Sequence, residues 1–161
     1  MPFPVSIRRK RSQAGLTLVE LVVAFTILIT LSAMALPMAR YKVRREKERD
    51  LRASLLEIRK AIDKYKDMAE QGQLGQIKIG TENYPETLEM LVEGVKVPGA
   101  TEKKIRFLRR MPRDPFTGNT DWGKRSVQDD PKSSSWGGQN VFDVYSKTME
   151  KAPDGTAYSE W

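Results

Sequence analysis

A single carboxylate, Glu20, interrupts an otherwise apolar run in this 161-residue chain. Residues 16–39 are nearly all apolar or small, and four cations stand together shortly before them at residues 8–11. About 20 apolar residues in a helix match the ~30 Å hydrocarbon core of a bilayer. A carboxylate in such a segment either reaches water at the membrane surface or pairs with a cation, and the residues alone leave both interpretations open.

The segment before Glu20 offers a source for that cation. Residues 1–15 are basic and end in the small pair Ala14-Gly15, ahead of the apolar segment, whereas a secretory signal is cut after its apolar region. Cleavage after Gly15 would leave the apolar segment on the mature protein and create a new amine on Leu16. That amine, from the same or a neighbouring subunit, would then pair with Glu20.

The composition narrows the chemistry available elsewhere. The chain has no histidine and no cysteine, so the common general base, the thiolate nucleophile and the usual zinc ligands are all missing. No constellation of carboxylates, serines or lysines stands out in their place. We therefore do not expect an enzyme.

The net charge of +7 has two visible sources. One is the leader, and the other is a basic cluster between Arg40 and Arg49, just after the apolar segment. The cluster would suit an acidic lipid surface or a nucleic acid. It would equally suit a solvated helix face, because Glu46 and Glu48 alternate with its cations, and this plainer interpretation is the one we favour.

Two helical patterns follow one another along the chain, and they must position Glu20 and the basic cluster. Residues 40–71 hold no glycine or proline, and their apolar positions recur at spacings of 4 and 3, as on one face of a helix. The two segments are expected to form one long rod, kinked at Pro37. The predicted core positions are Leu51, Leu55, Ile58, Ile62, Tyr65 and Ala69.

Turn residues dominate the rest of the chain. Gly72 and Gly75 should end the long helix, and a short helix ended by Gly94 is expected next. Two strands are predicted, around 121–127 and 141–146, with a polar loop between them.

The stretch "GLTLVELVVAFTILITLSAMALP" resembles the N terminus of type IV pilins and type II secretion pseudopilins. This resemblance implies that a prepilin peptidase cuts after Gly15, that Leu16 is N-methylated, and that Glu20 forms an assembly salt bridge with a neighbour's amine. The chain departs from the family at Leu16, where Phe is usual, and at Ile29, where many relatives have Gly.

Four later segments, "AIDKYKDMAEQG", "NYPETLEMLVEG", "RRMPRDPFTGN" and "FDVYSKTMEKAPDGTAYSEW", resemble the major pseudopilin in the same order. The resemblance implies an α+β, pilin-like fold: a long N-terminal helix, half membrane and half amphipathic, packed on a small antiparallel sheet. It divides the chain into a cleaved leader (1–15), a transmembrane and filament-core helix (16–39) and a soluble periplasmic domain (40–161).

In many such proteins the last loop holds calcium, and here Asp154 and Asp143 are the candidate ligands. Calcium takes six to eight oxygens, several from carboxylates, and this loop is poor in acids. The alternative is that Pro153-Asp154-Gly155 is simply a tight turn.

Taken together, the resemblance implies a structural subunit of a type II secretion pseudopilus. Its expected location is the bacterial inner membrane, single-pass, with the filament in the periplasm. The implied partners are copies of itself, minor pseudopilins, prepilin peptidase and an inner-membrane assembly platform, with nucleic acid not expected. The alternatives are a type IV pilin for adhesion, motility or DNA uptake, and a single-span protein that binds an acidic ligand or lipid.

Overall fold

The computed structural model describes residue 15, residues 17–99 and residues 104–161, without the side chains of residues 34–39. The chain divides into two compact units, Met1–Val43 and Arg44–Trp161, and each is described by itself below. Helix α1 (Leu18–Glu70) contributes to both.

Helix α1 begins and ends close to where the sequence predicts. Its first backbone hydrogen bond runs from the Leu21 N–H to the Thr17 carbonyl at 3.1 Å. Past its last residue the chain turns at Gly72, whose positive φ of 67° favours glycine over any residue with a Cβ. Pro37 lies within the bounds of α1, and the kink expected there stays a prediction.

The core of the unit Arg44–Trp161 is built on α1. All six predicted core positions of this helix are buried, which confirms the amphipathic pattern. Burying each of the leucine and isoleucine side chains among them contributes about 1.5–3 kcal/mol. The residues that cover them come from across the rest of the unit and include Leu91, Leu108, Trp122, Val141, Val144 and Tyr158.

The short helix expected near Gly94 is α2 (Glu89–Glu93). Two strands that the sequence did not reveal follow it, β1 (Val95–Lys96) and β2 (Lys104–Ile105), paired antiparallel. With two residues each, they are too short to show an alternating pattern.

The two predicted strands appear as β3 (Gly123–Arg125) and β4 (Asp143–Tyr145), which also pair antiparallel. Gly123 faces Tyr145 in the register. A Cβ at Gly123 would lie 2.3 Å from the Tyr145 ring, so the ring occupies the space that any larger residue would need.

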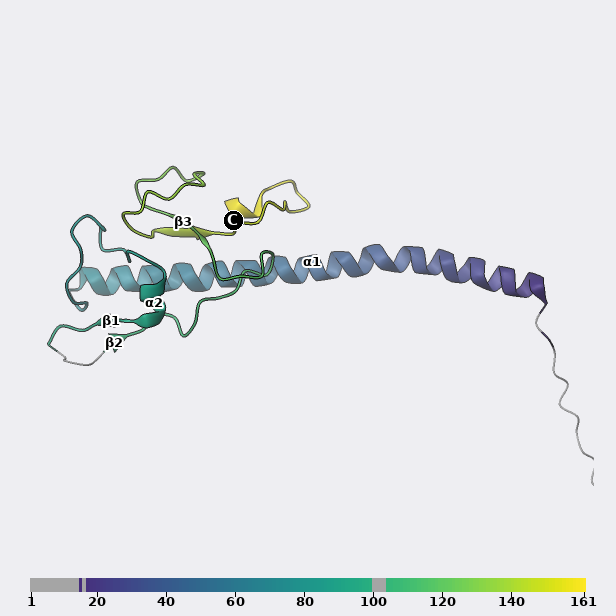
Figure 1. Cartoon of the computed structure of the whole chain (residues 1–161), viewed down its shortest axis with the longest axis horizontal. Helices are drawn as coiled ribbons and strands as arrows, with labels where there is room; N and C mark the ends of the chain where they lie inside the picture. The colour runs from purple at the N-terminus through teal and green to yellow at the C-terminus, as the bar shows by residue number, and fades with distance from the viewer. Residues whose placement is uncertain (1–14, 16, 100–103) are drawn as a thin grey trace, which may run out of the picture. The chain divides into compact units, whose positions relative to one another are not determined.

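The chain closes with a single 3-10 turn, η1 (Tyr158–Glu160). Figure 1 shows the order of the elements along the chain. A long N-terminal helix with small antiparallel sheets makes an α+β structure consistent with a pilin-like fold. The expected single sheet is, among the described residues, two separate two-stranded sheets.

Candidate functional site

The N terminus of α1 holds Glu20 in its first turn. The backbone N–H of Glu20 donates to the Thr17 hydroxyl at 3.3 Å, which makes Thr17 the capping residue and Glu20 the third helical residue. A carboxylate at this position is stabilised by the positive end of the helix dipole. The Thr-x-x-Glu spacing of a capping box was visible in the sequence and was missed there.

Gly15 is exposed, and a Cβ added to it would meet no atom within 4 Å. It is also not among the glycines with positive φ. Nothing in the described structure therefore requires glycine at this position. Leu16, the predicted site of cleavage and N-methylation, lies outside the described residues.

The start of α1 presents apolar side chains to its surroundings. Ten large apolar residues between Leu18 and Leu31 are exposed, and an apolar surface of this extent marks an interaction site. The hydroxyls of Thr26 and Thr30 donate to the carbonyls of Val22 and Thr26, so these polar groups are satisfied within the helix.

In the described part of the chain, no helix combines the length and the apolar character needed to cross a membrane.

Asp143, a candidate calcium ligand, is paired with two arginines. Its Oδ1 accepts from Arg59 Nε at 2.7 Å, and its Oδ2 lies 3.5 Å from Arg125 Nη1. These partners come from α1 and β3, so the carboxylate links the helix to the β3–β4 sheet.

Asp154, the other candidate, closes a local turn. Its Oδ1 accepts from the Thr156 backbone N–H at 2.9 Å and from the Thr156 hydroxyl at 2.7 Å. These two bonds, the side-chain one first, lower the pKa of Asp154 below its ordinary value. Among the residues described, no three acidic side chains gather where they could hold a metal ion. The calcium site stays a prediction.

Tyr158 connects η1 to the start of the unit Arg44–Trp161. Its side chain is fully buried, and its hydroxyl donates to Glu48 at 2.7 Å and accepts from Arg44 Nε at 3.1 Å. Burial raises the pKa of Tyr158, because the phenolate would lose its hydration. The phenol therefore stays neutral and spans the Arg44–Glu48 pair, in which Arg44 Nε lies 3.7 Å from Glu48.

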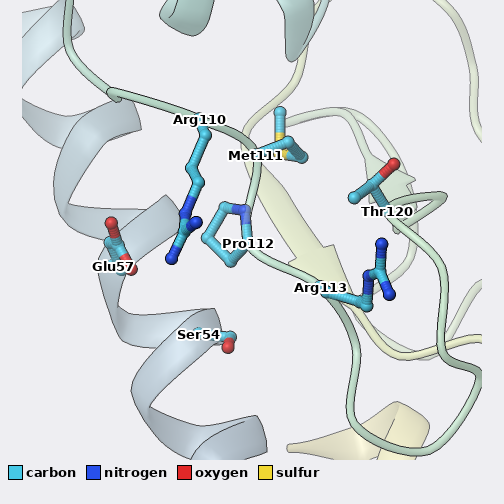
Figure 2. Close-up of a pocket in the computed structure, with 7 residues that line it drawn as sticks. All are labelled: Ser54, Glu57, Arg110, Met111, Pro112, Arg113 and Thr120. Carbon is cyan, nitrogen blue, oxygen red and sulfur yellow. The ribbon is translucent and has the colours of Figure 1, made fainter.

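A cavity of about 510 Å³ lies between α1 and the loop that follows β2. Figure 2 shows Arg110 extending toward Glu57 on α1, with Arg113 near Thr120 on the other side. Within the described part of the chain, neither guanidinium makes a hydrogen bond or ion pair. Sequence reasoning missed this cavity because its walls are more than 50 residues apart along the chain. It is lined by Ser54, Glu57, Arg110, Met111, Pro112, Arg113 and Thr120.

Residues 10–36 match the family model of the prokaryotic N-terminal methylation motif. The chain therefore carries the prepilin-type signature of type IV pilin-like and pseudopilin proteins, and Gly15, Leu16 and Glu20 lie within the matched residues. Comparison of the chain with curated proteins and with solved structures gave no match.

Proposed function

We propose that this chain, whose residues 10–36 carry the prepilin-type methylation motif, is a structural subunit of a type II secretion pseudopilus. The observation that carries the proposal is the motif itself, placed at the start of a helix that exposes a long apolar surface. The motif implies processing by prepilin peptidase and assembly into a pilin-type filament. The role is structural and not enzymatic.

Processing would prepare the N terminus for assembly. Removal of residues 1–15 leaves an amine on Leu16, four residues before Glu20. Glu20 already stands in the first turn of α1, where its carboxylate is favoured. A carboxylate away from water is unfavourable unless a cation pairs with it. In the filament, the amine of a neighbouring subunit forms this ion pair with Glu20.

The apolar surface of α1 would leave lipid for the filament core. Burial of apolar area contributes about 25 cal/mol per Å² when the area leaves water. Here the helix leaves the bilayer of the inner membrane, so that term is small and does not select a register. The specific pairing of Glu20 with an amine would select it.

The soluble unit would lie outside the membrane, in the periplasm, and coat the filament. The cavity between α1 and the loop of Arg110 and Arg113 offers two guanidiniums that form no ion pair with any described residue, and these suit an acidic side chain of a neighbouring subunit. Minor pseudopilins and the assembly platform are further partners in this proposal.

A type IV pilin for adhesion, motility or DNA uptake is the second candidate, because the methylation motif is common to both classes. The two candidates can be distinguished by expressing the chain in a host bacterium that has the secretion machinery and in one that has the pilus machinery. A pseudopilin restores protein export in a host that lacks its own major pseudopilin, whereas a pilin restores surface filaments.

The mass of the mature protein tests the proposal. Membranes from cells with prepilin peptidase should yield a chain that begins at Leu16 and carries one added methyl group. Cells without the peptidase should yield the chain with residues 1–15 attached. Gly15→Leu is the matched variant, since the fold tolerates a side chain at this position. An intact N terminus in the presence of the peptidase would contradict the proposal and favour a single-span binding protein.

A further inference from the structure

We infer that the C-terminal segment, residues 150–161, is attached to α1 by arginines and a buried tyrosine, without a metal ion. The segment comprises an exposed loop, an isolated bridge between Lys151 and Ala157, and η1. The resemblance to pseudopilins implies a calcium ion at this place. The donor groups of this chain do not fit one.

The carboxylate of Asp143, one of the two candidate ligands, is already neutralised. Both oxygens of Asp143 face guanidinium groups, with Arg59 Nε at 2.7 Å and Arg125 Nη1 at 3.5 Å. Calcium takes six to eight oxygen ligands, usually several carboxylates among them. A divalent cation here would have to displace two arginines, which breaks both ion pairs of Asp143, or stand beside their positive charge, which Coulomb repulsion opposes.

Three backbone carbonyls of the segment also accept from arginines. The carbonyl of Ser159 accepts from Arg125 at 3.1 Å, and that of Trp161 accepts from Arg59 at 2.8 Å. The carbonyl of Lys151 accepts from Arg44. Carbonyl oxygens are the other ligands that calcium takes from a loop, and guanidinium groups already bind these three.

Two aromatic side chains complete the attachment. Tyr158 is fully buried, stacks on Phe116 with ring centroids 4.2 Å apart, and donates to Glu48 on α1. The ring of Trp161 lies against the guanidinium of Arg52, 4.1 Å from its centroid. Arginine is suited to both tasks, because its planar fork donates to several acceptors and also stacks on aromatic rings.

The attachment of residues 150–161 to α1 therefore depends on arginine geometry and not on the calcium concentration around the protein. Arg59 is the central member, because a single guanidinium contacts Asp143 and the carbonyls of Val144 and Trp161. A lysine at this position keeps the charge but loses the fork. This inference is independent of filament assembly, since it concerns contacts within one soluble unit.

Calcium titration of the unaltered protein is the first test. The full chain, purified in detergent, is stripped with a calcium chelator and then melted with and without millimolar calcium. Hydrogen exchange of the 150–161 backbone is followed under both conditions. We expect no change in melting temperature and no change in exchange. A rise of several degrees in melting temperature with calcium, or faster hydrogen exchange after chelation, would overturn the inference that the attachment is metal-free.

Substitution of Arg59 is the second test. Arg59→Met should speed exchange in residues 150–161 about tenfold or more, and Arg59→Lys should give an intermediate effect. Lys60→Met is the matched control, because it removes the same charge from the neighbouring, exposed position. If Arg59→Met does not fold, Asp143→Asn offers a milder loss of the same pair. Unchanged exchange in both the Arg59 and the Asp143 variants would refute the role of the arginines.

Discussion

The backbone N–H of Glu20 donates to the hydroxyl of Thr17 across 3.3 Å, so the residue that carries the carboxylate of the methylation motif is also part of a helix cap. This relationship gives Glu20 two separable properties. Its position in the first turn stabilises the helix, and its charge is available to a cation.

Substitutions at Glu20 should separate these two properties. Glu20→Ala and Glu20→Gln are both expected to leave processing and membrane insertion intact and to abolish filaments, because both remove the charge. Thr17→Ala weakens the cap by about 1 kcal/mol but keeps the carboxylate, so filaments should persist. Filament yield by electron microscopy, with the mature mass as control, measures all three. Normal filaments from Glu20→Gln would contradict the role of the Glu20 charge in assembly.

Arg110 and Arg113 should matter for assembly more than for folding. Changing both to Glu reverses the charge of a cavity in which neither guanidinium has a partner among the described residues. We expect an unchanged melting temperature and a lower filament yield. Lys132→Glu changes an exposed cation elsewhere and serves as the control. Equal yields from the two variants would leave the cavity without a role in subunit contacts.

The β3–β4 pair should not accept a side chain at Gly123. Gly123→Ala places a Cβ against the Tyr145 ring and is expected to cost about 1–3 kcal/mol of unfolding free energy. In a Tyr145→Leu background the ring is gone, and the same substitution should cost less. Chemical denaturation of the unaltered chain, the two single variants and the double variant yields the coupling free energy, and additive effects would show that the ring does not limit this position.

The amphipathic face of α1 should dominate the stability of the unit Arg44–Trp161. Ile62 is 0% exposed, and Ile62→Ala is expected to cost about 2–5 kcal/mol because it leaves a cavity. Leu56 on the same helix is 53% exposed, and Leu56→Ala should change stability by no more than about 0.5 kcal/mol. Urea unfolding compares the two. Similar costs would mean that Leu56 is covered in the folded protein.

Asp129 should make the protein more sensitive to acid. Its carboxylate accepts from the backbone N–H of Ser126 at 2.7 Å and of Gly137 at 3.0 Å, and these bonds lower its pKa below the ordinary 3.8. A lowered pKa adds stability above pH 3.8, and that contribution disappears as the pH falls through the lowered value.

Melting temperatures measured between neutral and acidic pH check this expectation. Asp129→Asn should be less stable at neutral pH and should lose less on acidification. Asp67→Asn, at an exposed position of α1, should follow the unaltered protein. If the melting temperatures of Asp129→Asn and the unaltered chain fall in parallel as the pH is lowered, Asp129 does not contribute to the acid sensitivity.

Much of α1 could be predicted because its determinants are local. The spacing of Leu51, Leu55 and Ile58 marks the buried face, and a glycine follows the helix end. The strands at Gly123 and Asp143 were also predicted, although longer than they are. Strands β1 and β2 were not, because two residues carry no periodic signal.

Taken alone, the amino-acid sequence determined the methylation motif, the long helix and its buried face, since each depends on neighbours a few residues apart. Only the tertiary structure decided what Asp143 does. Its partner Arg59 is 84 positions away, and Tyr158 reaches Glu48 across 110. Such pairs depend on how elements pack, and packing brings together side chains whose proximity no local pattern records. A carboxylate that suits calcium by type was therefore found beside two arginines.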